Sequence, residues 1–290
     1  MAPFSIHPAT GVGPVALTVA DLDRSERFYR DVIGFKALGR AGDTVTLTAD
    51  GATPLLTLTG QTGARRRPPR TTGLYHFAIL TPSRADLARS LRRLAETRWP
   101  LSGASDHLVS EALYLDDPDG NGIEIYSDRP REAWPRQNGQ IQMATDPLDF
   151  DNLLAELDRD SQTLDGLAPG TIIGHVHLHV ADLRAAEDFY HGVLGFDIIQ
   201  RYGPSALFVS AGGYHHHIGL NTWAGVGAPP PPPGSVGLRS FVVHMPDAAA
   251  RDAVLERVRE AGMAIEEVAE GVLIRDPSAN SVVLTIDDRR

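Results

Sequence analysis

The sequence predicts an α+β fold of four βαβββ modules in two tandem halves, and internal matches support this prediction. Residues 13–38 match residues 174–199 without a gap, with 13 of 26 positions identical. Two weaker matches follow, 73–82 with 237–246 and 117–126 with 276–285. Because self-similarity at a regular spacing marks repeated structural units, these landmarks divide the chain into four modules of roughly fifty residues.

Each module has the pattern of a strand, a helix and about three more strands. In the strongest repeat an alternating strand precedes an Asp-capped helix, and Gly-Phe opens the next strand. The apolar residues of these two helices recur at helical spacing: Leu22, Phe28, Tyr29 and Val32 in the first, and Leu183, Ala186, Phe189, Tyr190 and Val193 in the second. Similar patterns predict helices from Ser83 to about Thr97 and from Asp247 to about Ala261.

We expect the first half, with modules 1 and 2, at residues 10–128 and the second half, with modules 3 and 4, at residues 172–288. Residues 129–171 form a linker between the halves. Its spaced apolar residues predict one short helix there: Phe150, Leu153, Leu154 and Leu157. At 290 residues the chain is long enough for about two domains with cores of their own.

Composition narrows the function before any motif is considered. The net charge of −10 argues against nucleic acid and anionic membranes as partners. No apolar run reaches the length of a membrane span, and residues 1–10 lack the features of a signal peptide, so we expect a cytoplasmic protein. Since the chain has no cysteine, any metal must be held by His, Asp, Glu or water.

The segment EALYLDDPDGNGIEIY, residues 111–126, predicts a β-hairpin. A strand at 112–115 leads into a turn rich in Pro and Gly, and a second strand carries Glu124. Glu124 is an ionisable residue among apolar ones, and burying an unpaired carboxylate is costly. It therefore either faces solvent, as on many antiparallel strands, or holds a cation.

Histidines recur at strand spacing in two places. His175, His177 and His179 alternate with apolar residues and share one face of a predicted strand, and His76 shares a face with Ala78. With the apolar residues packed on a helix, these histidines would line a concave face of a sheet. A histidine in a strand is also commonly a hydrogen-bonded residue without a ligand role, so the spacing alone leaves both interpretations open.

Four βαβββ units in two halves, with a first-strand histidine and DPDGNGIE (117–124) in a last hairpin, resemble the vicinal oxygen chelate superfamily. This superfamily includes glyoxalases, fosfomycin and bleomycin resistance proteins, and extradiol ring-cleaving dioxygenases. The resemblance covers the whole chain and is strongest to the catechol 2,3-dioxygenase branch. It implies the vicinal oxygen chelate (glyoxalase-like) fold, which serves unrelated chemistries.

The resemblance also implies a set of metal ligands. The superfamily places ligands in the first and last strands of a module, and extradiol dioxygenases use two His and one Glu. The matching residues here are His76, Glu124 and His175. Other such positions hold residues that cannot complete a triad: Pro14, Ser240 and Val283. Because the three ligands belong to modules 2 and 3, these two modules must pair in space, and modules 1 and 4 must form a half without a site.

Two further residues match catalytic positions of the dioxygenases. Tyr114 stands ten positions before Glu124, where the family has a tyrosine that orients the diol by a hydrogen bond. His216 takes the place of the second member of a double histidine, which serves as acid and base. A pocket lining is expected from residues near these: Asp106, His107, His177 and His179.

The orientation of the triple histidine follows from strand alternation. If residues 214–220 are extended, His216 shares a face with Ile218 and Leu220, whereas His215 and His217 point the other way. The alternative is a solvated polar hairpin without a catalytic role.

The resemblance implies an extradiol ring-cleaving dioxygenase that acts on a small aromatic diol and O2. Two His and one carboxylate suit non-haem Fe(II), with Mn(II) as the second choice. We expect a homo-oligomer. The alternatives are a glyoxalase-like metal-dependent isomerase or lyase, and a metal-free ligand-binding or resistance protein of the same fold.

Overall fold

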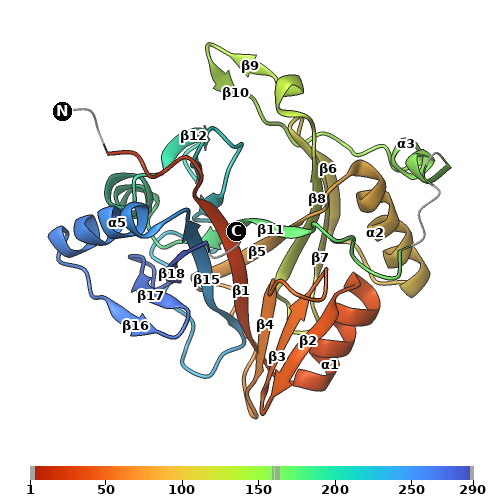
Figure 1. The fold of residues 1–290 in the computed structure, drawn as a ribbon, viewed down its shortest axis with the longest axis horizontal. Helices are drawn as coiled ribbons and strands as arrows, with labels where there is room; N and C mark the ends of the chain where they lie inside the picture. Colours follow the sequence, from red (N-terminus) through yellow and green to blue (C-terminus); the bar gives the residue numbers. More distant parts are fainter. Residues whose placement is uncertain (1–3, 159, 161–163, 288–290) are drawn as a thin grey trace.

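The computed structural model describes residues 4–158, 160 and 164–287. Part of the predicted linker (159 and 161–163) and the last residue of the predicted second half, Asp288, lie outside them. The chain forms two curled eight-stranded sheets, whose central strands cross the middle of the molecule, with α1, α2 and α5 at the outside (Figure 1). This confirms the predicted α+β fold of βαβββ modules.

The first sheet combines module 1 with module 4, in the order β16-β17-β18-β15-β1-β4-β3-β2. The strands of module 1 are β1 (Gly11–Val19), β2 (Lys36–Ala41), β3 (Thr44–Thr48) and β4 (Leu56–Gly60). Those of module 4 are β15 (Gly237–Met245), β16 (Glu266–Val268), β17 (Gly271–Arg275) and β18 (Ser281–Ile286). The modules join through the antiparallel pair β1 and β15.

The second sheet combines module 2 with module 3, in the order β12-β13-β14-β11-β5-β8-β7-β6. The strands of module 2 are β5 (Gly73–Leu80), β6 (Gly103–Asp106), β7 (Ser110–Asp116) and β8 (Gly122–Asp128). Those of module 3 are β11 (Ile172–His179), β12 (Asp197–Tyr202), β13 (Ala206–Ser210) and β14 (Ile218–Asn221). Modules 2 and 3 therefore pair directly, through the antiparallel strands β5 and β11, as the candidate ligands required.

Each module contributes one helix, and each helix begins at a residue that caps it. The side chains of Asp21, Ser83, Asp182 and Asp247 accept a hydrogen bond from a backbone N–H in the first turn. The helices are α1 (Leu22–Arg27), α2 (Arg84–Thr97), α4 (Leu183–Glu187) and α5 (Ala248–Glu260). Helices α1 and α4 continue as π-helical turns, η1 (Phe28–Ile33) and η4 (Asp188–Val193), which the sequence pattern did not predict.

The repeated DP turns have a structural role that accounts for their similarity. The hydroxyl of Tyr29 donates to buried Asp117, and the hydroxyl of Tyr190 donates to Asp276 in the same way. Asp117 also accepts from the backbone and side chain of Asn121. The turns thus hold module 1 to module 2 and module 3 to module 4, because the tyrosine and the turn belong to consecutive modules.

The linker lies against modules 2 and 3. It contains η2 (Arg131–Ala133), a small projecting hairpin of β9 (Arg136–Gln137) and β10 (Gln140–Ile141), the predicted short helix α3 (Phe150–Leu154), and η3 (Ala155–Asp158) (Figure 1). Trp134 and Ile141 are buried with Tyr214 of module 3. Residue Asp146 bridges to Asp106 at the edge of β6.

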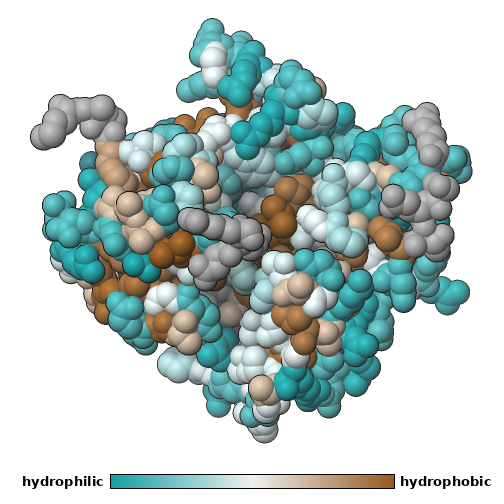
Figure 2. All heavy atoms as spheres, in the orientation of Figure 1, coloured by the Kyte–Doolittle hydropathy of each residue, from teal (hydrophilic) through white to brown (hydrophobic). Residues whose placement is uncertain are grey.

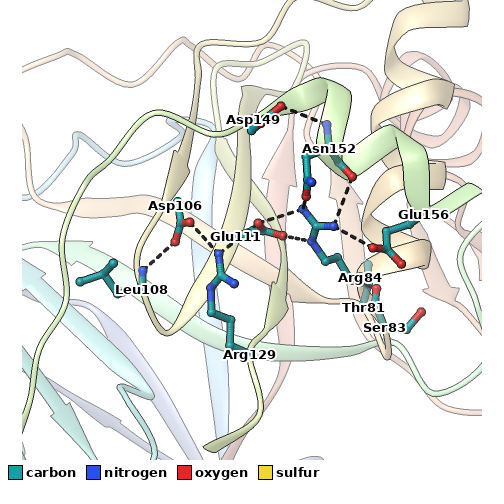
Figure 3. Close-up of polar contacts among 10 residues, drawn as sticks. All are labelled: Thr81, Ser83, Arg84, Asp106, Leu108, Glu111, Arg129, Asp149, Asn152 and Glu156. Carbon is teal, nitrogen blue, oxygen red and sulfur yellow. Dashed lines mark hydrogen bonds and ion pairs between the residues drawn. The ribbon is translucent and has the colours of Figure 1, made fainter. Parts of the chain in front are cut away.

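A charged network fixes α3 to module 2 (Figure 3). Buried Glu111 accepts two bonds from the Arg84 guanidinium, at 2.5 and 3.1 Å, and one from Arg129 at 3.2 Å. Arg84 also reaches Asn152 and Glu156 of the linker. Glu111 is thereby compensated by two cations, which is the condition under which a buried carboxylate is tolerated.

Hydrophilic residues dominate the outer parts of the face in Figure 2, and hydrophobic ones gather toward its middle. None of the described helices combines the length and the apolar composition that crossing a membrane requires.

Candidate metal centre and active-site cavity

The candidate ligands are brought together by strand register. Strands β11, β5 and β8 are neighbours, and residue Ala78 of β5 pairs with His175 on one side and with Glu124 on the other. His76 precedes Ala78 by two positions and so lies on the same face. Because Ala78 is small and fully buried, the three longer side chains can converge above it.

The three side chains meet at one carboxylate oxygen. Glu124 Oε2 lies 3.0 Å from His76 Nε2 and 3.1 Å from His175 Nε2, and all three side chains are buried. Burial alone would raise the pKa of Glu124, but His175 and His76 outweigh it and hold that pKa well below its usual range. Burial lowers the pKa of His175 to about 4. At neutral pH the carboxylate is charged and His175 is neutral, which is the state that binds a metal ion.

The geometry suits a cation better than a hydrogen-bonded triad. His76 Nε2 is buried and near the carboxylate, yet it makes no hydrogen bond within the described part of the chain. His175 Nε2 is within hydrogen-bond distance of the same oxygen, so two imidazole nitrogens aim at one carboxylate oxygen, as ligands do around a shared ion. Within the described residues, this is also the one group of three or more His, Asp or Glu side chains close enough to share a metal ion. Two His and one carboxylate form the donor set of non-haem iron sites.

Two β-bulges between β5 and β11 adjust this alignment. His76 pairs with His177 and Leu74 pairs with Leu178, so Tyr75 is an extra residue on β5 and faces the cavity beside His76. On β11 the extra residue is Gly174, where an added Cβ would lie 1.9 Å from the hydroxyl of Tyr126. Only glycine fits at this position unless Tyr126 moves.

Tyr114 lies next to the centre because its ten-residue spacing from Glu124 makes the two directly opposed on the β7–β8 hairpin. Its hydroxyl is 2.6 Å from His107 Nε2, and His107 Nδ1 is 2.6 Å from the carbonyl of Ala144. Since a carbonyl only accepts, Nδ1 carries the proton and Nε2 accepts from Tyr114. Burial and the charge of Glu124 raise the pKa of Tyr114 well above its usual value, so it is a neutral phenol.

Two residues, Asp128 and His215, fix the orientation of the His216 ring. Asp128 Oδ1 lies 2.9 Å from His215 Nε2, and His215 Nδ1 lies 2.8 Å from His216 Nδ1. Because the carboxylate accepts from His215, the His215 Nδ1 atom accepts from His216, and Nε2 of His216 keeps a free lone pair. The His216 ring is 4.1 Å from that of His175, between their centroids. Burial and the surrounding histidines lower the pKa of His216 well below its usual value.

The predicted orientation of the triple histidine is wrong. Strand β14 begins only at Ile218, so alternation does not extend back through the preceding residues. Ile218 and Leu220 are buried in the core, whereas His216 lines the cavity. His215 does not point away either, because its ring is packed between Asp128 and His216.

The centre lies in a cavity of about 420 Å³. Of the expected residues, Tyr114, His76, Glu124, His216, His107 and His177 line it. Asp106, His179 and the candidate ligand His175 do not: Asp106 pairs with Arg129, His179 is hydrogen-bonded to Asn221, and His175 is buried beside Glu124. The linker supplies a wall through Met143, Ala144 and Thr145, which sequence reasoning missed. It also missed Asp128 and His215, although the double histidine pointed to the latter.

The chain matches the model of the Glyoxalase/Bleomycin resistance protein/Dioxygenase superfamily over residues 11–125 and 172–282. It belongs to this superfamily. A relative in Bacillus subtilis (strain 168), named catechol-2,3-dioxygenase, is 49% identical over 96% of this chain and 98% of its own length. Biphenyl-2,3-diol 1,2-dioxygenase 3 of Rhodococcus globerulus is 29% identical over 43% of this chain and 68% of its own.

Solved structures agree on the fold. A candidate dioxygenase from Bacillus subtilis subsp. subtilis str. 168 superposes with a TM-score of 0.65 at 14% identity, covering 98% of this chain and 87% of the other. Glyoxalase I from Zea mays gives a TM-score of 0.56 at 16% identity, covering 95% and 92%.

Proposed function

We propose that this chain is an extradiol dioxygenase, which inserts both atoms of O2 into a catechol-type diol with ring cleavage. The observation that carries the proposal is the convergence of His76, Glu124 and His175, two of which line a cavity together with Tyr114 and His216. The near full-length similarity to a protein named catechol-2,3-dioxygenase supports it.

We propose Fe(II) as the metal, held by His76, Glu124 and His175. When bound, it would supply a Lewis acid for the diol oxygens and an electron donor for O2. Mn(II) has similar ligand preferences and is the second choice.

In this proposal His216 is the acid and base. Its Nε2 atom accepts a proton from a diol hydroxyl and returns it later in the reaction. Asp128 and His215 keep Nε2 free for this role, because they fix the proton of His216 on Nδ1.

Tyr114 has an orienting role. Its hydroxyl donates to His107 and can at the same time accept a hydrogen bond from the diol. His107, itself bonded to the linker carbonyl of Ala144, fixes the phenol beside Glu124. The diol ring is thereby positioned between Tyr114 and His216.

The decisive experiment starts from protein reconstituted anaerobically with Fe(II) and mixed with catechol before ¹⁸O2 is admitted. The expected product is the ring-opened acid with both labelled atoms, detected by mass spectrometry. No consumption of O2 with iron bound would reject the proposal. Reconstitution with Zn(II) or Ni(II) should give no turnover, whereas an isomerase would work with these metals.

Variants then separate chemistry from metal binding. His216→Ala should lower kcat by at least about 10²-fold. Tyr114→Phe removes a hydrogen bond between neutral groups, worth about 0.5–1.5 kcal/mol, and should lower kcat by roughly 2–12-fold. Iron content should stay near that of the wild type in both variants. The control is His7→Ala, which removes an exposed histidine that does not line the cavity. Full activity of His216→Ala with iron bound would remove this residue from the mechanism.

We further propose that the enzyme is a cytoplasmic homo-oligomer, as expected from the sequence. Sedimentation analysis at several protein concentrations tests the assembly.

A further inference from the structure

The floor of the cavity is a single row of residues across the second sheet. The row contains one residue from each strand between β12 and β7, and each residue is paired in register with the next one in the row. The row runs along the sheet face that carries the candidate ligand His76. In order across the sheet they are Gln200, Phe208, Gly219, His177, His76, Gly122 and Asp116. All of them except Gly219 line the cavity.

This row extends far beyond the space that one diol ring needs. Neighbouring strands are about 4.8 Å apart, so the four steps from His76 to Gln200 span roughly 19 Å along the sheet. A cavity of about 150 Å³ is enough to hold benzene. The cavity here has about 420 Å³. A ring bound at the metal centre therefore leaves more than half of the space empty.

The part of the cavity beyond the centre is aromatic. The ring of His177 lies 5.6 Å from Phe208 and 5.3 Å from Trp223, and Tyr75 meets Trp223 edge-on at 5.2 Å. Gly219 contributes by its lack of a side chain, because an added Cβ would lie 2.8 Å from the ring of His177. We call this region, formed by His177, Gln200, Tyr202, Phe208 and Trp223, the distal subsite.

The charge of the cavity excludes anionic substituents. None of the described residues that line it is Lys or Arg, whereas Glu124 and Asp116 are acidic. Two polar atoms of the distal subsite, His177 Nε2 and Gln200 Oε1, are buried without a hydrogen-bond partner in the described part of the chain. A carboxylate would find no cation here, but a neutral polar group would find partners.

From these observations, and resting on the proposed function, we infer that the substrate is an uncharged catechol with a ring-sized aromatic substituent. The diol ring lies at His76 and Glu124. The substituent lies in the distal subsite, over His177 and Phe208 and against Trp223. The aromatic walls favour stacking or edge-on contacts with a second ring.

The test compares catechol, 3-phenylcatechol, 4-phenylcatechol, and each phenylcatechol with a carboxylate on its second ring. At least one phenylcatechol should exceed catechol in kcat/KM by on the order of 10–100-fold, as expected for burying a ring the size of Phe. Its carboxylated form should be at least tenfold poorer than the uncharged one. Equal or lower values for both phenylcatechols would overturn the inference, even though cleavage of catechol itself would uphold the proposed function.

Binding provides a readout that does not depend on turnover. Calorimetry on the metal-free protein, without O2, should give a lower Kd for the preferred phenylcatechol than for catechol. If no diol is cleaved with iron bound, the proposed function fails, and this comparison still decides whether the distal subsite binds a ring. Equal Kd values would then overturn the inference.

Variants locate the preference. Phe208→Ala and Trp223→Ala should each lower the ratio of kcat/KM for the phenylcatechol to that for catechol by at least about fivefold. Trp223 is half-exposed, so its truncation should not prevent folding. Phe150→Ala, which truncates an exposed aromatic residue of α3 outside the cavity, is the matched control and should keep the ratio. An unchanged ratio in the Trp223 and Phe208 variants would contradict the assignment of the substituent to this region.

Discussion

Asp128 Oδ1 lies 2.9 Å from Nε2 of His215, a fully buried histidine that in turn contacts the candidate acid and base. A carboxylate behind an imidazole fixes which nitrogen carries the proton, as in hydrolase triads. Here the effect passes through a second ring to His216. Asp128 and His215 are therefore positioning residues.

Replacing Asp128 tests this chain of hydrogen bonds from Asp128 through His215 to His216, which we call the relay. Asp128→Asn can donate to His215 and so favours the wrong tautomer, and kcat should fall by at least about tenfold with a changed pH profile. Iron content should stay near that of the wild type. Asp151→Asn, at an exposed aspartate of α3, is the control. An unaltered kcat and pH profile in Asp128→Asn would show that the relay has no catalytic role. His215→Ala should also be damaging, contrary to what strand alternation suggested.

Metal binding should stabilise the fold. An ion that binds only the native state adds about 2.7 kcal/mol at a hundred times its Kd, so anaerobic Fe(II) should raise the Tm of the wild type by several degrees. Glu124→Ala should lose this response, while Glu96→Ala, at an exposed glutamate, should keep it. Differential scanning fluorimetry provides the measurement. The same rise in Glu124→Ala would place the ion elsewhere.

Stability should decrease on acidification partly because of His217. Its Nδ1 atom accepts from the hydroxyl of Ser210 and the N–H of Ala211, so it is bound in the neutral form. Burial lowers its pKa to about 3, and the lowering is reinforced by His215, His244, His175 and Arg131. The unfolded chain takes up this proton near pH 6.5, so stability is complete above that pH and declines toward pH 3.

The titration of His217 alone should lower the free energy of unfolding by about 2 kcal/mol between pH 7.5 and pH 5. Urea unfolding of the metal-free protein at both pH values should therefore show a smaller loss in His217→Gln than in the wild type, by about that amount. His7→Gln, at an exposed histidine, is the control. Identical losses in wild type and His217→Gln would contradict the neutral burial of this ring.

The network around Glu111 should contribute measurably to stability. Glu111→Gln keeps the shape of the side chain but leaves Arg84 and Arg129 without their shared anion, at a cost of about 1–3 kcal/mol. Glu96→Gln removes one partner of an exposed pair and should cost less than about 0.5 kcal/mol. Hydrogen exchange should also become faster in α3. Equal unfolding free energies for the two variants would show that the network is not stabilising.

The sequence predicts the fold well because its signals are local. Each signal acts within a few residues: the Asp and Ser helix caps, the apolar stripes of the helices, and the DP turns. The internal repeat presents such signals more than once along the chain. The convergence of His76, Glu124 and His175 was predicted from the family resemblance. The direct pairing of modules 2 and 3 followed only from this ligand set.

Long-range register was not predictable in this way. The bulges at Tyr75 and Gly174 depend on which strand lies beside β5. The alternation of side chains along a single strand carries no information about such bulges. The orientation of His216 failed for the same reason, because the segment before β14 is shaped by its contacts with Asp128 and the linker. The placement of Ala144 against His107 likewise joins residues that no local pattern connects.

The pairing of β5 with β11 has a consequence for how the protein is made. During synthesis β5 and β8 emerge early with two of the three candidate ligands, but the other edge of β5 has no partner until residue 179 has left the ribosome. The edge of β1 that pairs with β15 stays unpaired for longer, because β15 ends at residue 245. Unpaired edges of this kind invite association with other chains. The nascent first half therefore depends on the later half for protection, and a separately expressed first half should aggregate.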